Sequence, residues 1–307
     1  MKLMQLKNIT GLLLGCILYA ATLPALAQAP GAQRTFDSPE AAAKALIAAA
    51  AADDEAALVD IFGAKHRGVV ATTDKVQDRE SRARFAGAAK QYQLLRAEKD
   101  GRVTLLVGAE AWPLPIPLTQ TAGAWRFDTA AGAEEIVNRR IGANELAAIE
   151  ALTFYGDAQR QYAAKPRDNT NVRQFAQRLG STSGKKDGLY WEADASKGEE
   201  LSPLGPLLKD AAGRTRGEPY NGYSYKVLKG QGPAAPGGRY SYVINGRMVA
   251  GYALIAYPAQ YRISGVKTFI VNHYGDVYEK DLGPKIATVA ASISEYNPDK
   301  TWSLVAD

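Results

Sequence analysis

The sequence is poor in the residues that carry most metal and thiol chemistry. Its 307 residues include one cysteine, Cys16, and two histidines, His66 and His273. The histidines lie far apart in the chain, so no His-x-x-x-His or comparable zinc-ligand spacing occurs. Cys16 falls in a segment that we expect to be removed, which leaves the mature chain without a disulfide, a thiolate nucleophile or a cysteine-bound metal. We therefore expect no metal site and no cofactor.

The sequence motifs of common enzyme classes are also missing. There is no G-x-S-x-G nucleophile elbow, no P-loop and no G-x-G-x-x-G that follows a strand. The formal net charge is only +5, and lysines and arginines form no continuous block. Such a mild excess is typical of a solvated surface and not of a nucleic-acid interface. The sequence thus specifies no reaction, and it favours a non-enzymatic protein that binds no nucleic acid.

Residues 1–27 have the pattern of a signal peptide. Lys2 and Lys7 form a basic start, residues 9–21 are apolar, and an Ala-Leu-Ala cleavage signal ends at Ala27. The apolar run is too short and wrongly flanked for a stable membrane span, and we expect no span in the mature chain. The sequence therefore predicts cleavage after Ala27 and a periplasmic or secreted protein.

A lipoprotein is the alternative. Residues 13–16, Leu-Leu-Gly-Cys, resemble a lipobox whose cysteine would be acylated. Against this interpretation, the hydrophobic run continues past Cys16 as an uninterrupted signal peptide would. We prefer cleavage after Ala27 and keep the lipoprotein as the minority alternative.

Residues 28–142 are predicted to form helices followed by an antiparallel sheet. Ser38 can cap a helix that begins with proline, and alanine-rich sequence follows it. The pattern changes at Tyr92, beyond which Asp100-Gly101 separates two apolar runs and so predicts a hairpin. Helices followed by such a sheet resemble the NTF2-like class, which includes both enzymes and binding modules.

Residues 143–307 are predicted to form a second helix-plus-sheet domain. A helical segment, 133–164, is expected to break at 138–142, with Asn144 capping the part that follows. A 3.6-residue period then places an apolar face on this helix, which predicts that it docks on a sheet. That face consists of Ala148, Ala151, Leu152, Tyr155, Ala158 and Tyr162.

The densest strand signals lie between residues 251 and 283. The runs 252–257 and 268–271 are apolar, and Asn272-His273-Tyr274-Gly275 forms a turn before a third run at 277–280. This pattern predicts a β-meander. The predicted fold class is therefore α+β, with two antiparallel-sheet-plus-helix halves.

Several ordered motifs resemble a bacterial family of exported proteins, domain of unknown function family 2950. The resemblance implies an envelope protein whose activity the family name leaves open. Where the family pattern leads us to expect glycine after Tyr261, this chain has Arg262. In the second half, the pattern from Ala256 to Phe269 also resembles the globular head of pilins and pseudopilins, which bears on fold and not on fibre assembly. The family motifs are NRRIG at 138–142, DGLYW at 187–191, SPLGPL at 202–207, GEPYNGY at 217–223, TFIVN at 268–272 and YEKDLG at 278–283.

Tyrosine is the one unusually concentrated residue. Eleven of the sixteen tyrosines lie between Lys186 and Gly283, several of them in glycine-rich stretches. Tyrosine and tryptophan offer broad contact area with a polar tip, which suits a protein or glycan partner. The alternative is that these rings pack as core under long loops. The candidate binding residues are Tyr190, Trp191, Tyr220, Tyr223, Tyr257, Tyr261 and His273.

Three functions remain open from the sequence. We favour a non-enzymatic periplasmic binding or interaction module of the cell envelope, with an envelope protein or a glycan as partner. The first alternative is an envelope hydrolase in which His273 works with Asp276, Glu279 and Asp281 at a hairpin end. The second alternative is a structural accessory of a secretion or surface assembly.

Overall fold

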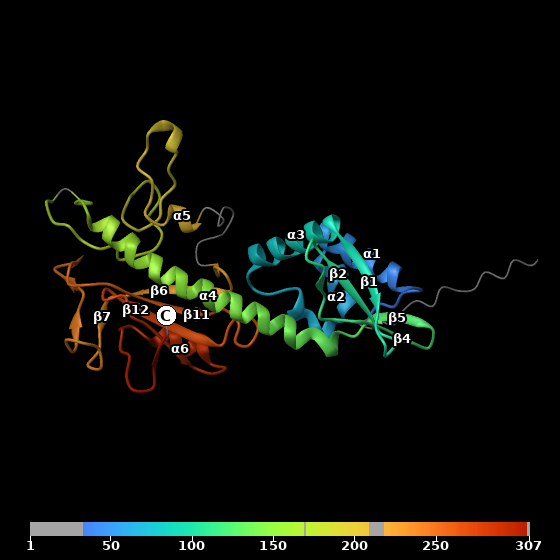
Figure 1. The fold of residues 1–307 in the computed structure, drawn as a ribbon. Coiled ribbons are helices and arrows are strands. Elements are labelled where there is room, and N and C mark those ends of the chain that lie inside the picture. Colours follow the sequence, from blue (N-terminus) through green and yellow to red (C-terminus); the bar gives the residue numbers. More distant parts are fainter. Residues whose placement is uncertain (1–32, 169, 209–217, 306–307) are drawn as a thin grey trace, which may run out of the picture. The chain divides into compact units, whose positions relative to one another are not determined.

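The computed structural model describes residues 33–168, 170–208 and 218–305, which belong to one compact unit, Gly31–Asp307 (Figure 1). The predicted signal peptide and the lipobox at Cys16 lie outside the described residues. The fold is α+β, as predicted, and it contains two five-stranded antiparallel sheets.

The first sheet follows three helices, as the sequence predicts. Ser38 begins α1 because its hydroxyl accepts a hydrogen bond from the Ala41 amide at 3.1 Å. The Asp100-Gly101 hairpin is also confirmed, with Gly101 at a φ of 82°. The helices are α1 (Pro39–Ala51), α2 (Glu55–Phe62) and α3 (Lys75–Gln91), with a 3-10 turn at Ala64–Val69. The strands are β1 (Gln93–Ala97), β2 (Val103–Val107), β3 (Trp112–Pro113), β4 (Leu118–Thr121) and β5 (Ala124–Phe127).

One hydrophobic cluster lies between these helices and the first sheet. Phe62 of α2 meets Phe127 of β5 with ring centroids 5.3 Å apart. Ile61, Ile116 and Leu118 are buried in the same cluster. The alternating pattern of β2 points Val103, Leu105 and Val107 into it, which is why this strand is predominantly buried.

The second sheet contains the predicted meander. Strands β11, β12 and β13 pair antiparallel in sequence order, and β6 pairs with the other edge of β11. Its strands are β6 (Tyr223–Leu228), β11 (Ala253–Pro258), β12 (Lys267–Asn272), β13 (Val277–Asp281) and β14 (Ser303–Leu304). The remaining elements are α5 (Gly205–Leu208), α6 (Ile286–Ser292), a 3-10 turn at Ala195–Lys197, and two short pairs, β7 (Gly230–Gln231) with β8 (Tyr240–Ser241) and β9 (Val243–Ile244) with β10 (Arg247–Met248).

A single helix, α4 (Thr129–Ala163), connects the two sheets in sequence, and the predicted break at 138–142 is wrong. The guanidinium of Arg140 donates to the carbonyl oxygens of Gly68 and Val69, which anchors the helix where a break was expected. Gly142 lowers helix propensity by only about 1 kcal/mol, which such contacts outweigh. The predicted boundary between residues 142 and 143 lies inside this helix, and the division into two domains stays a prediction.

The predicted apolar face of α4 is confirmed. All six of its residues are buried, and all of them except Ala151 belong to the hydrophobic cluster that includes β11 and β12. The predicted capping role of Asn144 is wrong, because Asn144 is buried inside the continuous helix. Its side-chain amide donates to the Ser264 carbonyl at 2.8 Å and accepts from Gln77 at 2.6 Å.

The turn at Arg262 explains why glycine was expected there. Arg262 has a φ of 57°, in the left-handed region that only glycine adopts without steric cost. Its amide nevertheless donates to the Gly265 carbonyl at 2.9 Å, so the turn forms with arginine in place. Arginine therefore occupies a left-handed backbone position in this turn.

Candidate functional site

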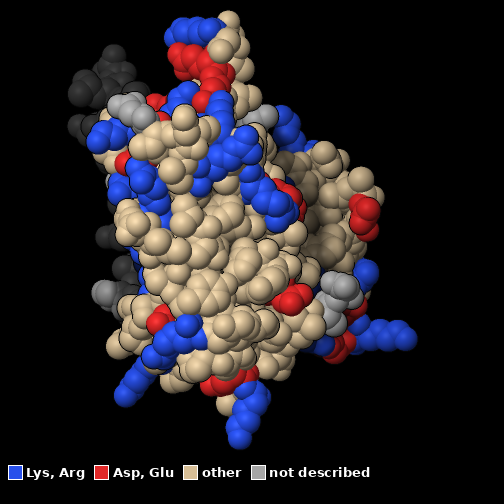
Figure 2. Space-filling view, turned by 90° about the vertical axis from the view of Figure 1, so that its left-hand side faces the viewer, with Lys and Arg blue, Asp and Glu red and all other residues tan. Residues whose placement is uncertain are grey.

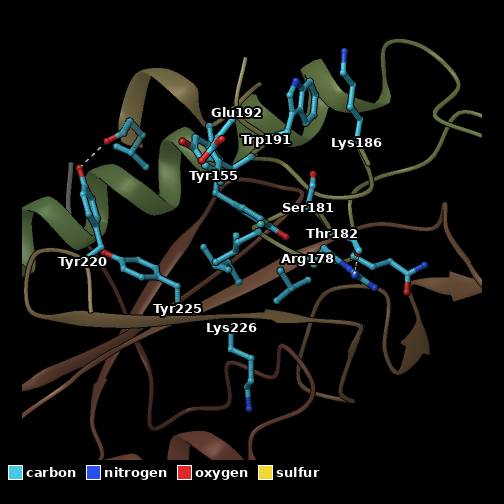
Figure 3. Close-up of a pocket in the computed structure, with 18 of the residues that line it drawn as sticks. Tyr155, Arg178, Ser181, Thr182, Lys186, Trp191, Glu192, Tyr220, Tyr225 and Lys226 are labelled. Atoms are coloured by element: carbon cyan, nitrogen blue, oxygen red, sulfur yellow. Dashed lines mark hydrogen bonds between the residues drawn. The ribbon is translucent and has the colours of Figure 1, made fainter. Parts of the chain in front are cut away.

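A groove with a volume of about 1680 Å³ lies in the second half of the chain (Figure 3). We call it the tyrosine groove. One wall is the buried face of α4, the floor is formed by β6 and β11, and the opposite wall is the loop segment 177–207. Its aromatic lining consists of Tyr155, Tyr190, Trp191, Tyr220, Tyr225 and Tyr257, and its aliphatic lining of Ala151, Leu179, Leu204, Leu207, Val227 and Leu254.

Hydrogen bonds to the backbone fix two tyrosine side chains of this groove. Tyr155 of α4 donates through its hydroxyl to the Ala253 carbonyl at 3.2 Å. Tyr220 donates to the Leu207 carbonyl at 2.9 Å, and its ring lies 6.5 Å from that of Tyr225 (Figure 3). Because the backbone holds these two hydroxyls, the rings of Tyr155 and Tyr220 offer preorganised contact area.

Gln159 holds the first part of the loop segment against α4. Its side-chain amide donates to the Ala176 carbonyl at 2.9 Å and accepts from the Ala176 amide at 2.8 Å. The same amide nitrogen also donates to the Tyr155 hydroxyl at 2.8 Å. Gln159 is fully buried, so these bonds form without competition from water.

A charged cluster holds the other part of the loop segment. The Glu200 carboxylate forms ion pairs with Lys165 at 2.7 Å, Arg167 at 2.8 Å and Lys186 at 3.2 Å. Partial desolvation raises the pKa of Glu200, but the hydrogen bonds from the three cations outweigh it and lower the pKa to about 2. The Trp191 indole donates to the Glu200 carbonyl at 2.8 Å, which places the ring at the groove wall.

The tip of the loop segment is shaped by one carboxylate. Asp187 accepts from the Thr182 amide at 2.7 Å and from its hydroxyl at 2.9 Å. Gly188 is required beside it, because an added Cβ would lie 2.7 Å from the Gly180 carbonyl carbon. Lys185, at the exposed tip, forms no ion pair with any other described residue. In the end-on view, Lys and Arg side chains gather over the upper loops while most of the face below is uncharged (Figure 2).

Four of the seven candidate residues line the tyrosine groove, namely Tyr190, Trp191, Tyr220 and Tyr257. The other three lie elsewhere. Tyr223 is fully buried in β6, and its hydroxyl donates to the Lys267 carbonyl at 2.9 Å, so its interpretation as a loop ring is wrong. Tyr261 donates to Asp281 at 3.1 Å.

His273 lies among tyrosine rings and not in the groove. Its ring centroid is 4.4 Å from Tyr274, 5.6 Å from Tyr242 and 6.1 Å from Tyr252. Desolvation lowers the pKa of His273, which favours the neutral ring.

The acidic residues of the same hairpin bond to residues other than His273 or are exposed. Glu279 pairs with Lys267 at 2.9 Å, Asp281 accepts from Tyr261, and Asp276 is exposed. Within the described part of the chain, no hydrogen bond or ion pair joins any of them to His273. In that same part, no three His, Cys, Asp or Glu side chains are grouped to hold a metal ion, and no helix is long and apolar enough to cross a membrane.

Tyr155 and Tyr225 are the aromatic groove residues that are absent from the candidates predicted from the sequence. Tyr155 was assigned to the packing face of α4, where it indeed lies, but that face also forms the groove wall. The alternation in Tyr-Ser-Tyr-Lys-Val at 223–227 was a usable signal for Tyr225 and Val227, because residues two apart share one face of a strand. Lys226 points the other way and donates to the Ala290 carbonyl at the end of α6 (Figure 3).

The comparison with protein families is consistent with the sequence resemblance. No curated protein and no solved structure shows significant similarity to this chain. The likeness of its halves to NTF2-like domains and pilin heads stays a prediction. The family model described as "Protein of unknown function (DUF2950)" matches residues 33–305, nearly the whole described chain. The chain therefore belongs to the DUF2950 family of proteins of unknown function.

Proposed function

We propose that this protein is an exported, non-enzymatic binding module whose tyrosine groove holds an extended segment of another envelope protein. The observation that carries the proposal is the composition of the groove. Tyrosine rings, aliphatic side chains and charges of both signs line one continuous cavity. A polypeptide carries apolar and charged side chains that could contact each of these three kinds of side chain.

The size of the groove supports a polymer over a small molecule. Pockets for small ligands are usually about 300–1000 Å³. At about 1680 Å³ the tyrosine groove exceeds that range. A segment of several residues would use this volume better than a single metabolite.

The chemistry of the lining supports a polypeptide over a glycan. Leu179, Leu204 and Leu207 come from the loop wall, and Val227 and Leu254 from the strands. Aliphatic side chains of this kind bury the apolar side chains of a peptide, which glycans do not have. Charges of both signs at the groove, Lys185 and Lys186 with Glu192 and Glu199, would add electrostatic complementarity to a peptide of mixed charge.

Export would bring the protein to the cell envelope, where this partner would be located. The signal-peptide pattern of residues 1–27 supports export. We expect the protein in the periplasmic or secreted fraction, with Gln28 as its first residue. Cell fractionation with N-terminal sequencing measures both. A mature chain that starts at Cys16 and incorporates a labelled fatty acid would instead identify a lipoprotein.

Peptide binding tests the groove itself. Linear peptides selected on the purified protein from a random-sequence phage library serve as the probe, and isothermal titration gives their dissociation constants. Tyr257→Ala removes a half-buried ring from the floor, and Lys185→Glu reverses a charge at the exposed tip. We expect Tyr257→Ala to weaken binding by about tenfold, or about 1.4 kcal/mol, since tyrosines are enriched among the residues that contribute most to binding. Lys185→Glu is expected to change the salt dependence of binding.

Tyr274→Ala is the matched control, because Tyr274 is 61% exposed and lies outside the groove. Its binding should equal that of the unaltered protein, and both tyrosine variants should keep the native circular dichroism. Equal losses in the two variants would contradict the assignment of the groove. Binding of isolated glycan chains without any selected peptide would overturn the polypeptide partner.

A further inference from the structure

Strand β1 is an open edge of the first sheet. The sheet runs in the order β1-β2-β4-β5, so β1 and β5 are its two edges. At β5, Trp125 exchanges two backbone hydrogen bonds of 2.8 Å with Phe36, which covers that edge. On the far side of β1, no strand of the described chain pairs (Figure 1).

The register fixes which backbone groups of β1 face outward. Gly108 donates to the Tyr92 carbonyl at 3.0 Å and Glu98 donates to the Arg102 carbonyl at 2.8 Å. In an antiparallel ladder every second residue bonds to the neighbouring strand, so the residues between them point their groups away from β2. These are Gln93, Leu95 and Ala97, and their N–H and C=O groups bond to no other described residue.

This edge has few of the features that keep edge strands from pairing. Strand β1 has no proline, no lysine and no bulge, and its one charged residue is Arg96. Apolar side chains are exposed along it, with Leu94 46% and Tyr92 41% exposed. An edge of this kind favours pairing with another strand.

We propose that β1 pairs antiparallel with β1 of a second copy of this chain, with the two-fold axis at Leu95. Gln93 then lies opposite Ala97 of the second copy, and all three outward-facing residues of each strand find hydrogen-bond partners. Shifting the register by two residues leaves part of these groups unpaired, because Gln91 already belongs to α3. The symmetric register is thus the one that uses the whole edge.

Side chains are compatible with this register. Leu95 packs at the border of the first hydrophobic cluster, so two copies of Leu95 extend that cluster across the axis. Leu94 comes opposite Arg96 of the second copy, whose aliphatic stem covers it. Each Arg96 is already paired with its own Glu98 at 3.0 Å, which reduces repulsion between the two arginines. A second copy would therefore pair the outward backbone groups and bury more of Leu94 and Leu95 without bringing unpaired like charges together.

Light scattering on the purified full chain tests the dimer. The unaltered protein should have twice the 32.9 kDa mass of one chain and dissociate on dilution. Gln93→Pro combined with Ala97→Pro removes two outward N–H groups and no β1–β2 hydrogen bond, so this variant should be monomeric. Gln93→Ala combined with Ala97→Ser, at the same positions, should remain dimeric. A monomer at every concentration, or a dimer that survives the prolines, overturns the proposal.

Disulfide cross-linking tests the register without prolines. In a Cys16→Ser background, Gln93→Cys and Ala97→Cys together should give a covalent dimer on mild oxidation. Hydrogen-bonded partners lie about 5.5 Å apart by Cα, within the range that a disulfide spans. Within one chain the two positions are about 13 Å apart and cannot bond. Each single cysteine variant should stay uncross-linked, and failure of the double variant to cross-link contradicts the pairing. This inference does not depend on the function of the tyrosine groove.

Discussion

Tyr223→Ala is expected to lower the free energy of unfolding by about 3–5 kcal/mol, the range for removing a buried aromatic ring. The Tyr223 side chain is 0% exposed, and its ring lies 6.0 Å from that of Phe269. Its hydroxyl donates to the Lys267 carbonyl in a partly buried hydrogen bond, which truncation also removes. Chemical denaturation followed by circular dichroism measures the loss.

Two milder variants separate the contributions at this position. Tyr223→Phe keeps the ring and removes one hydrogen bond, so it should cost about 1 kcal/mol. Tyr220→Ala removes a half-buried ring at the groove and should cost less than Tyr223→Ala. If Tyr223→Ala unfolded at the same denaturant concentration as the unaltered protein, Tyr223 would not be a core residue.

Gly132→Ala is expected to destabilise the protein by about 3 kcal/mol or more, at the upper end for overpacked sites. An added Cβ at Gly132 would lie 2.2 Å from the backbone oxygen of Pro115. The backbone of residue 132 fixes the position of the Cβ and the Pro115 oxygen belongs to the main chain, so no side-chain rotation relieves the contact. Thermal unfolding should show the loss as a marked decrease in Tm.

Gly142→Ala is the matched control in the same helix. Gly142 lies in the interior of α4, and an added Cβ meets nothing within 4 Å. Alanine should therefore increase stability by about 1 kcal/mol through helix propensity alone. A loss of stability at Gly142→Ala would contradict the continuous helix and restore the break that the sequence suggested.

The features that could be predicted from the sequence are those that depend on local periodicity. The apolar face of α4 follows from a 3.6-residue period, and the β11–β13 meander from alternating apolar runs and a glycine turn. The Ser38 cap follows from residues adjacent in the chain. In each case the pattern and the contact lie within a few residues of one another.

The features that could not be predicted depend on distant partners. The low helix propensity of Gly142 suggested a break. However, Arg140 donates to carbonyl oxygens some seventy residues earlier in the chain, and these contacts anchor α4 at this point. Asparagine is a residue type that often caps helices, yet Asn144 is buried and donates to the Ser264 carbonyl. The tyrosine groove needs Gln159 and Glu200 to hold the loop segment against α4. None of these long-range contacts leaves a periodic signal.

Hydrogen–deuterium exchange with a library-selected peptide tests the peptide-binding groove most directly. The probe is added at saturating concentration, and backbone protection is compared with the free protein. We predict that slowed exchange concentrates in residues 177–192 of the loop segment and in β6, which belong to the wall and floor of the tyrosine groove. Protection confined to the hairpin around His273 and Tyr274, or absent from the groove, would show that the peptide does not bind in the tyrosine groove.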